Sequence, residues 1–316
     1  MESRYVPGRR PPRVRERRHH VWLARIGAAG SIIAAGAILA VIVSGSTGGG
    51  SHKASKTPTK AAGTSTGPGT AKPGTASVPI LAYRVINSAP PGSSAPASLY
   101  VPGAQFSAQM NALKSNGWHA VTLDQVRAYW AKGTSLGPGK PIVISFDRGY
   151  ASQYTNALPV LKQLGWVAVV NLQVSGLSPT NGGMTESQVH GLLAAGWELD
   201  TEGVSQADLT VLSPAALHNE LTTAKQTVQS TYNVPANWFS YPTGSYDPTV
   251  VAAVRAAGFV GATTLEPGWA DPHGDRYRLA RLLVVSGTTP TALLSQIAAA
   301  QQANAPPDSS SGTGTT

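Results

Sequence analysis

Residues 142–150 read IVISFDRGY, and this stretch decides the fold. A run of apolar, mostly β-branched residues ends in Asp147, and the Gly149 that follows allows a sharp turn. The pattern predicts a buried strand with a carboxylate at its C-terminal end, where proteins of alternating strands and helices place their chemistry. Arg148 puts a cation directly beside that carboxylate. We therefore expect the functional site to be built around Asp147, and we also weigh a structural role for it, as a helix cap or as the partner of an arginine.

Apolar β-rich runs alternate with amphipathic stretches over most of the chain. The expected strands are 79–85, 119–123, 142–146, 166–172, 197–200, 238–241, 259–264 and 278–285. The expected helices are 104–115, 123–131, 152–164, 186–195, 214–232, 248–257 and 291–301. Strand–helix alternation of this kind predicts an α/β fold with a parallel, barrel-like sheet.

The stretch PIVISFDRGYASQYTNALPVLKQLGW resembles the first motif of the polysaccharide deacetylases, the NodB-homology domain of carbohydrate esterase family four. The segment 196–209, GWELDTEGVSQADL, is similar to the family's second motif. The resemblance covers about residues 78–302 and implies a distorted (β/α) barrel. It also implies that Asp147 is the general base, and that a divalent metal such as zinc is bound by a second aspartate and two histidines.

The residues at those three metal-ligand positions are substituted in this chain. They are Arg148, Glu202 and Gln206. An arginine cannot lose its proton to bind a metal, and a glutamine is a weak, neutral oxygen ligand. We therefore expect no metal cofactor and an ion pair between Arg148 and Glu202, with Gln206 as an orienting residue. Arg281, in YRLARLLVV, resembles the arginine of another family motif and is a candidate partner of Asp147.

A substrate groove is implied by the segment WFSYPTGSYD at 238–247, which resembles the family's third motif. The candidate substrate-binding residues are Tyr150, Tyr241, Pro242, Thr243, Gly244 and Trp269. Thr243 replaces the aromatic residue of the motif, so a backbone donor to an oxyanion is retained where a stacking platform is lost. Trp269 is a candidate replacement for that platform.

The N-terminal part of the chain has the sequence of a membrane anchor. Residues 4–18 carry seven arginines, and 26–44 is an uncharged, mostly apolar run of nineteen residues. Such a run spans roughly 28 Å as a helix, and the flanking arginines place the N-terminus in the cytoplasm and the rest of the chain outside. A cleaved signal peptide is the alternative.

Five segments follow from these features. They are a basic cytoplasmic tail at 1–25, a transmembrane helix at 26–44, a disordered linker rich in Gly, Ser, Thr and Pro at 45–77, the domain at 78–302, and a disordered tail at 303–316. From residue 78 onward, twelve Lys and Arg stand against thirteen Asp and Glu, although the whole chain carries +9. The positive charge belongs to the first segments, so the domain has no nucleic-acid signature. The chain lacks cysteine, which excludes disulfides and thiolate metal sites.

Three functions fit the sequence. The first is a membrane-anchored pseudoenzyme of the cell envelope that binds N-acetylated cell-wall or surface polysaccharide or regulates a partner. The second is an active, metal-independent deacetylase or amidohydrolase that uses Asp147 as base and Arg148 as electrophile. The third is a structural envelope domain.

Overall fold

The computed structural model describes residues 72–91, 96–176 and 182–303. Within these residues, nine strands form one curled sheet, a half-barrel, in the order β7-β6-β5-β4-β3-β1-β8, with β2 beside β3 and β9 beside β1. The strands are β1 (Val78–Tyr83), β2 (Trp118–Ala120), β3 (Lys140–Arg148), β4 (Val169–Gln173), β5 (Glu198–Gly203), β6 (Trp238–Ser240), β7 (Gly261–Thr263), β8 (Trp269–Ala270) and β9 (Leu282–Leu283). The helices are α1 (Gly103–Ser115), α2 (Leu123–Lys132), α3 (Leu158–Leu164), α4 (Glu186–Ala194), α5 (Pro214–Tyr232), α6 (Pro248–Ala256) and α7 (Pro290–Ala303).

Parallel pairing dominates the sheet, as the alternating pattern predicts. Strands β1 and β4 both run parallel to β3, in registers that include Tyr83 beside Phe146 and Asn171 beside Asp147. Only β8 is antiparallel to its neighbour among the described strands, and it was not predicted because two residues carry no periodicity. The expected strands 278–285 and 259–264 shorten to β9 and β7.

The helices begin and end where the sequence has capping residues. Helices α2 and α4 each start with a capping box, in which a threonine side chain and a glutamine three residues later satisfy backbone groups. Helix α5 is capped by Ser213 and ends at Asn233, which adopts the left-handed conformation. Local sequence therefore sets the boundaries of these helices, and burial of their apolar faces holds them against the sheet.

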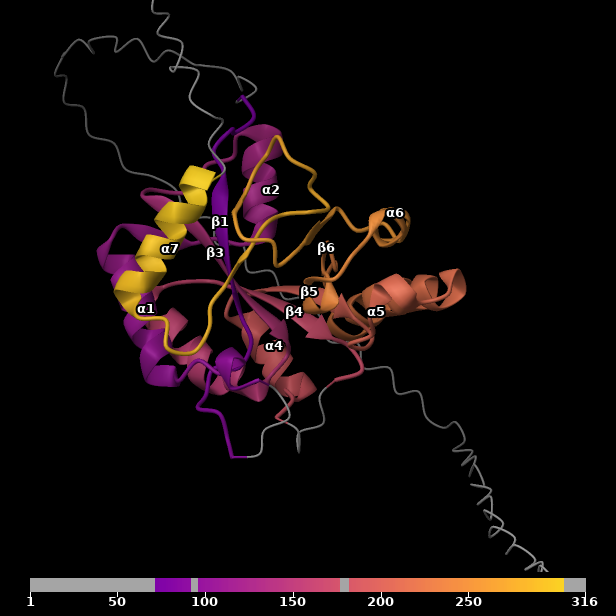
Figure 1. Cartoon of the computed structure of the whole chain (residues 1–316), viewed down its shortest axis with the longest axis horizontal. Helices are drawn as coiled ribbons and strands as arrows, with labels where there is room; N and C mark the ends of the chain where they lie inside the picture. Colours follow the sequence, from indigo (N-terminus) through magenta and orange to yellow (C-terminus); the bar gives the residue numbers. More distant parts are fainter. Residues whose placement is uncertain (1–71, 92–95, 177–181, 304–316) are drawn as a thin grey trace, which may run out of the picture. The chain divides into compact units, whose positions relative to one another are not determined.

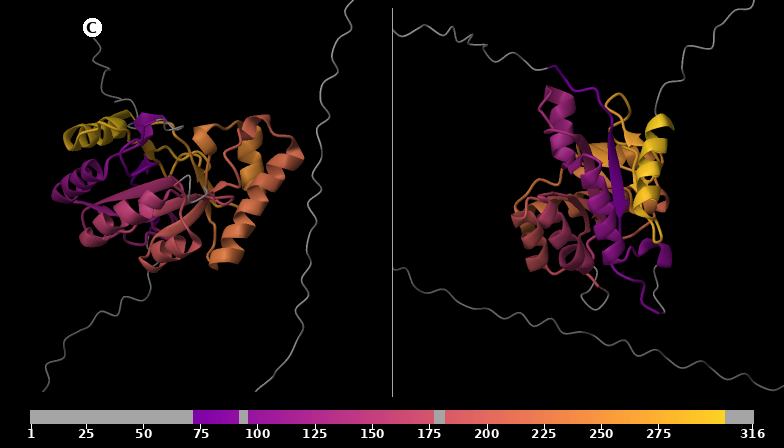
Figure 2. Two further views of the ribbon diagram at one scale, coloured as in Figure 1. Left: turned by 90° about the horizontal axis from the view of Figure 1, so that it is seen from below. Right: turned by 90° about the vertical axis from the view of Figure 1, so that its left-hand side faces the viewer.

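The core lies between the sheet and the surrounding helices. Helices α1 and α7 pack side by side, while α5 packs against β5 (Figures 1 and 2). Phe146 stacks on Trp197 with ring centroids 5.1 Å apart, and Tyr83 meets Phe106 edge to face at 5.2 Å. These contacts pack β3 against the start of β5 and β1 against α1, since large aromatic side chains contribute much of a core's buried area.

The chain after β3 forms an unusual helical turn. Residues Gln153–Ala157 adopt a π-helical turn that leads directly into α3, where the sequence predicted one continuous helix at 152–164. Such turns occur frequently at functional sites. The wider turn brings the buried Gln153 back to the end of β3, where its amide donates to the backbone carbonyls of Arg84 and Asp147 at 2.8 and 2.7 Å.

The expected anchor at 26–44 and most of the expected linker lie outside the described residues. Among the residues that are described, no helix is long and apolar enough to cross a membrane. Contacts with the domain begin before Val78, because the backbone N–H of Gly74 donates to Tyr129 and the indole of Trp130 donates to the carbonyl of Ala76.

Candidate active site

A buried ion pair occupies the centre of the site. Asp147, at the C-terminal end of β3, accepts two hydrogen bonds from the Arg281 guanidinium, at 2.8 Å to Oδ1 and 3.1 Å to Oδ2. Both side chains are at most 1% exposed. The remaining donors of Arg281 reach the carbonyl of Thr264 and the hydroxyls of Ser145 and Ser240. The predicted pairing of Arg281 with Asp147 is confirmed.

Asp147 is held in its charged form. Burial raises the pKa of the Asp147 carboxyl, but the charge and hydrogen bonds of Arg281 outweigh burial, with help from Arg84 and Asn171, and leave that pKa below its usual value. Asn171, on β4, donates to Oδ1 of Asp147 at 2.8 Å. The carboxylate is thus ionised at neutral pH and is already well supplied with donors.

Arg148 does not pair with Glu202, so that prediction is wrong. Its guanidinium donates to the side-chain oxygen of Gln206, and no salt bridge of the described residues includes Arg148. Arg148, the last residue of β3, has a left-handed φ of +75°, whereas Glu202 is completely buried, so the two side chains end in different surroundings. The side chain of Arg148 remains partly exposed and its Nε is buried without a hydrogen-bond partner.

Glu202 is a fully buried carboxyl without an ion-pair partner. Its residue is 0% exposed and neither carboxyl oxygen has a partner in hydrogen-bonding geometry. Burial, followed by the charge of Asp147, raises the pKa of Glu202 to about 7, against smaller lowering contributions from Arg84, from the nearby Gln206 side chain and from Arg281. Two neighbouring carboxyls therefore differ in protonation near neutral pH, Asp147 ionised and Glu202 partly protonated.

The residues at the implied metal-ligand positions do not fit a divalent metal. Arg148 carries a permanent positive charge, and its hydrogen bond uses the one oxygen through which Gln206 could bind a metal. Only the carboxylate of Glu202 remains, whereas a catalytic zinc site takes three protein ligands. Elsewhere in the described ranges there is no cluster of three or more His, Asp or Glu side chains suited to a metal ion.

The third-motif segment lies at the same end of the sheet, with a different exposure for each residue. Pro242–Gly244 form a 3₁₀ turn after β6, in which Pro242 is buried and Thr243 is exposed with φ at +55°. Tyr241 is only 1% exposed, and its hydroxyl donates to the carbonyl of Tyr277 at 2.9 Å. The ring of Tyr241 therefore belongs to the core and offers almost no surface to a substrate, although it was predicted as a substrate-binding residue.

Trp269 is at the wrong end of the sheet to bind a substrate beside Asp147. It lies on β8 opposite Pro79, at the N-terminal end of β1, whereas Asp147 follows the residue paired with Tyr83 at the other end. Four residues of strand separate the two ends by about 13 Å. The Trp269 indole also donates to the carbonyl of Ile297 on α7, so this tryptophan anchors the last helix.

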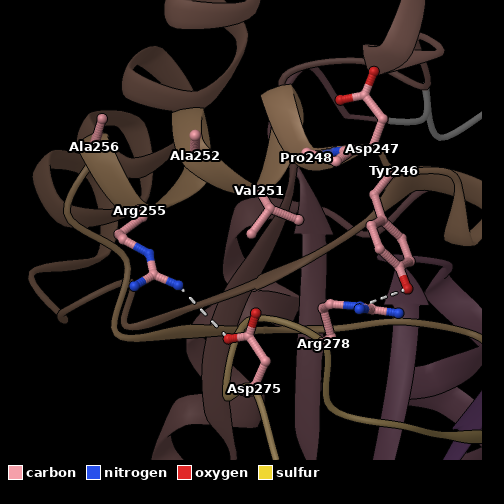
Figure 3. A pocket seen from close by; sticks show the side chains of 9 residues that line it. All are labelled: Tyr246, Asp247, Pro248, Val251, Ala252, Arg255, Ala256, Asp275 and Arg278. Carbon is pink, nitrogen blue, oxygen red and sulfur yellow. Dashed lines mark hydrogen bonds and ion pairs between the residues drawn. The ribbon is translucent and has the colours of Figure 1, made fainter.

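A hollow of about 760 Å³ lies beside the third-motif segment, between α6 and the chain that precedes β9 (Figure 3). Both arginines that line the hollow have partners within it. Arg255 lies 3.7 Å from Asp275, and Nε of Arg278 donates to the hydroxyl of Tyr246 at 2.9 Å. The predicted residue Tyr150 lies apart from this hollow, buried after β3 and bridged to Gly183.

Three residues that sequence reasoning did not assign to the site belong to it. They are Arg84, Gln153 and Asn171. Asn171 gave a usable signal, since it interrupts the apolar strand VVNLQ, and a buried polar residue normally has a specific partner. Gln153 gave none, because a glutamine in an amphipathic helix is ordinarily exposed.

Comparison with known proteins agrees with this architecture. Residues 135–262 match the family model described as polysaccharide deacetylase. YxkH of Bacillus subtilis, whose name assigns it provisionally to the polysaccharide deacetylases, is 28% identical over 217 residues, which are 69% of this chain and 75% of YxkH.

Two solved structures show the same fold. The deacetylase PplD of Streptococcus pyogenes, solved with acetate, is 24% identical with a TM-score of 0.64, and the match covers 71% of this chain and 99% of PplD. IcaB from Ammonifex degensii is 21% identical with a TM-score of 0.58, covering 70% of this chain and 96% of IcaB.

Proposed function

We propose that the chain, which belongs to the polysaccharide deacetylase family, is a glycan-binding or regulatory protein of the bacterial cell envelope that does not carry out the family's metal-dependent hydrolysis of N-acetyl groups. The observation that carries the proposal is the hydrogen bond between Arg148 and Gln206, which joins two of the three positions that hold metal ligands in the resemblance. The guanidinium of Arg148 supplies a positive charge at these positions, but unlike a metal ion it cannot bind and activate a water molecule.

The free energy that a bound metal would contribute to hydrolysis supports a protein that does not carry out this reaction. A bound metal that lowers the pKa of water from about 15.7 to about 7 supplies at most roughly 12 kcal/mol toward forming the nucleophile. A general base typically contributes about 10²- to 10⁴-fold, or roughly 3–5 kcal/mol. Asp147 is in addition held by Arg281 and is 1% exposed, so it has little access to a water molecule.

The proposed location rests on the sequence. The arginine-rich segment 4–18 followed by the apolar run 26–44 favours a single-pass anchor with the domain outside the cytoplasm. The names of the relatives, which describe deacetylases, support an acetylated polysaccharide as the ligand class.

The test is acetate release from N-acetylglucosamine oligomers, measured with and without added zinc and with a chelator. The proposal expects no release above the uncatalysed background under any of these conditions. Zinc-dependent release would overturn it.

A second candidate is a metal-independent amidohydrolase, and one observation favours it. Asp147 and Glu202 are neighbouring carboxyls with pKa values displaced in opposite directions, a pattern found in acid–base pairs. Release of acetate that is insensitive to chelators and abolished by Asp147→Asn would establish this candidate. The near-complete burial of both side chains is the reason we place it second.

A further inference from the structure

The charges around Asp147 do not balance. The charge of Arg84 lowers the pKa of both Asp147 and Glu202, and Arg281 binds Asp147 directly. Together with Arg148, three arginines therefore share one end of the sheet with two carboxyls. Of these three, only Arg281 forms a salt bridge within the described residues. The surplus is one positive charge with Glu202 ionised and two with Glu202 protonated.

Unsatisfied polar atoms gather at the same place. The buried side-chain atoms without a hydrogen-bond partner include the donors Nε of Arg84, Nε of Arg148 and Nε2 of Gln206, and also acceptor oxygens of Glu202, Gln153 and Asn171. Buried donors without partners cost about 1–3 kcal/mol each, more when charged, and such groups usually meet an ordered water or a ligand. The hollow beside α6 differs, because its arginines pair with Asp275 and Tyr246.

Arg84 and Arg148 lie on neighbouring strands at this end of the sheet. Tyr83 is in register with Phe146, so Arg84 and Arg148 follow these partners by one and two residues. Gln153 ties the two strands together there, through hydrogen bonds to the carbonyls of Arg84 and Asp147. Adjacent strands are about 4.8 Å apart, which is within the span of one small ligand group.

We infer that Arg84 and Arg148 bind the carboxylate of an acidic sugar, so that the site selects an anionic glycan unit over a neutral one. The guanidinium fork matches the planar geometry of a carboxylate, and the partly exposed Arg148 offers the entry. A singly charged carboxylate fits the surplus of one that remains when Glu202 is ionised, and Asp147 repels it less than it would a doubly charged phosphate. The inference rests on the proposed function only in taking this end of the sheet as a binding site.

The test compares two probes that differ by one group. N-Acetylmuramic acid is N-acetylglucosamine with a carboxylate-bearing ether, so the pair isolates the carboxylate. In ligand-observed NMR titrations of the full chain at pH 7 and low salt, we expect N-acetylmuramic acid to bind at least about tenfold more tightly than N-acetylglucosamine, in line with one to two charge-assisted hydrogen bonds. Added sodium chloride should weaken the acidic probe selectively.

Variants locate the effect. Arg148→Gln should reduce binding of the acidic probe about 10- to 100-fold, to the level of the neutral one, and Arg84→Lys should weaken it less because the charge remains. Arg127→Gln is the matched control, since Arg127 is 49% exposed on α2 and pairs with Asp124 away from the site. Arg148 is partly exposed, so its variant should keep the unfolding temperature of the natural chain, which is measured alongside.

Four results would overturn the inference. They are equal binding of the two sugars, no binding of either, and unchanged binding by a folded Arg148→Gln variant. The fourth is displacement of the acidic probe by inorganic phosphate that binds as tightly as the probe does. None of these bears on acetate release. Release of acetate would instead overturn the proposed function and leave a preference for the acidic sugar standing, so the two failures are distinguishable.

Discussion

The buried carboxyl of Glu202 should make the protein less stable as the pH rises, and Glu202→Gln should remove that loss. The folded-state pKa is raised from about 4.5 to about 7, so the folded protein keeps a proton that the unfolded chain has released. The stabilisation is therefore complete below pH 4.5 and is lost as the pH rises through 7. Over the full range the loss is about 3 kcal/mol, at about 1.4 kcal/mol for each pKa unit.

Two pH values give a practical measurement. Between pH 5 and pH 8 the same displacement predicts a change of about 2–3 kcal/mol, slightly less than over the full range because some of the unfolded chain is still protonated at pH 5. The difference in unfolding free energy between Glu202→Gln and the natural protein should grow by this amount from pH 5 to pH 8. Urea unfolding followed by tryptophan fluorescence measures both proteins at both pH values.

The control is Glu266→Gln, which changes a glutamate that is 54% exposed and whose ion-pair partner, Arg278, keeps its charge between pH 5 and pH 8. Its difference from the natural protein should stay the same at the two pH values to within about 0.5 kcal/mol. Other buried carboxyls, such as Asp200, titrate in all three proteins and cancel in the comparison. If Glu202→Gln shows no growth of its difference between pH 5 and pH 8, the reasoning on the buried Glu202 carboxyl is refuted.

Further changes test the surrounding structure. Arg281→Gln should lower the unfolding free energy by about 3–5 kcal/mol, because it leaves the Asp147 carboxylate buried and unpaired. Adding Asp147→Asn should restore part of that loss, as measured by denaturant unfolding. An equal or larger loss in the double variant would argue against the ion pair. Arg148→Ala and Glu202→Ala should show less coupling in unfolding than Arg281→Gln and Asp147→Asn do, since Arg148 and Glu202 form no salt bridge and are linked only through Gln206, and an equal or larger coupling would contradict the geometry. The segment 26–44 should be retained in the cell-associated protein, and intact mass spectrometry showing a mature N-terminus just beyond it would exclude the anchor.

Much of the fold could be predicted from the sequence, because the elements obey local rules. The apolar run before Asp147 became β3 in the expected place, and the helix predicted at 214–232 has the same bounds as α5. Capping residues such as Ser213 act within a few residues of the helix end, so their signal is present in the sequence itself. The two-residue strand β8 depends on pairing with β1, which no local pattern specifies.

The site could be predicted only in part, because motif resemblance identifies residues but not the partners that the fold brings to them. A strand-end aspartate and a distant arginine could be identified from motif resemblance, and Asp147 and Arg281 do meet. The partner of Arg148 could not be identified, because it depends on the positive φ at Arg148 and on where the fold places Gln206, and no local pattern specifies either. Opposite charges at corresponding positions favour a pair only when the backbone directs both side chains to the same place.

Rebuilding the metal site tests the central claim most directly. The combined variant Arg148→Asp, Glu202→His and Gln206→His places an aspartate and two histidines at the implied ligand positions, and an aspartate also tolerates the left-handed backbone at 148 better than arginine does. Zinc titration calorimetry and acetate release from N-acetylglucosamine oligomers are measured on this variant and on the natural chain. The account predicts that the variant binds about one zinc ion per chain and releases acetate, whereas the natural chain does neither. Stoichiometric zinc binding with acetate release by the natural chain would contradict it.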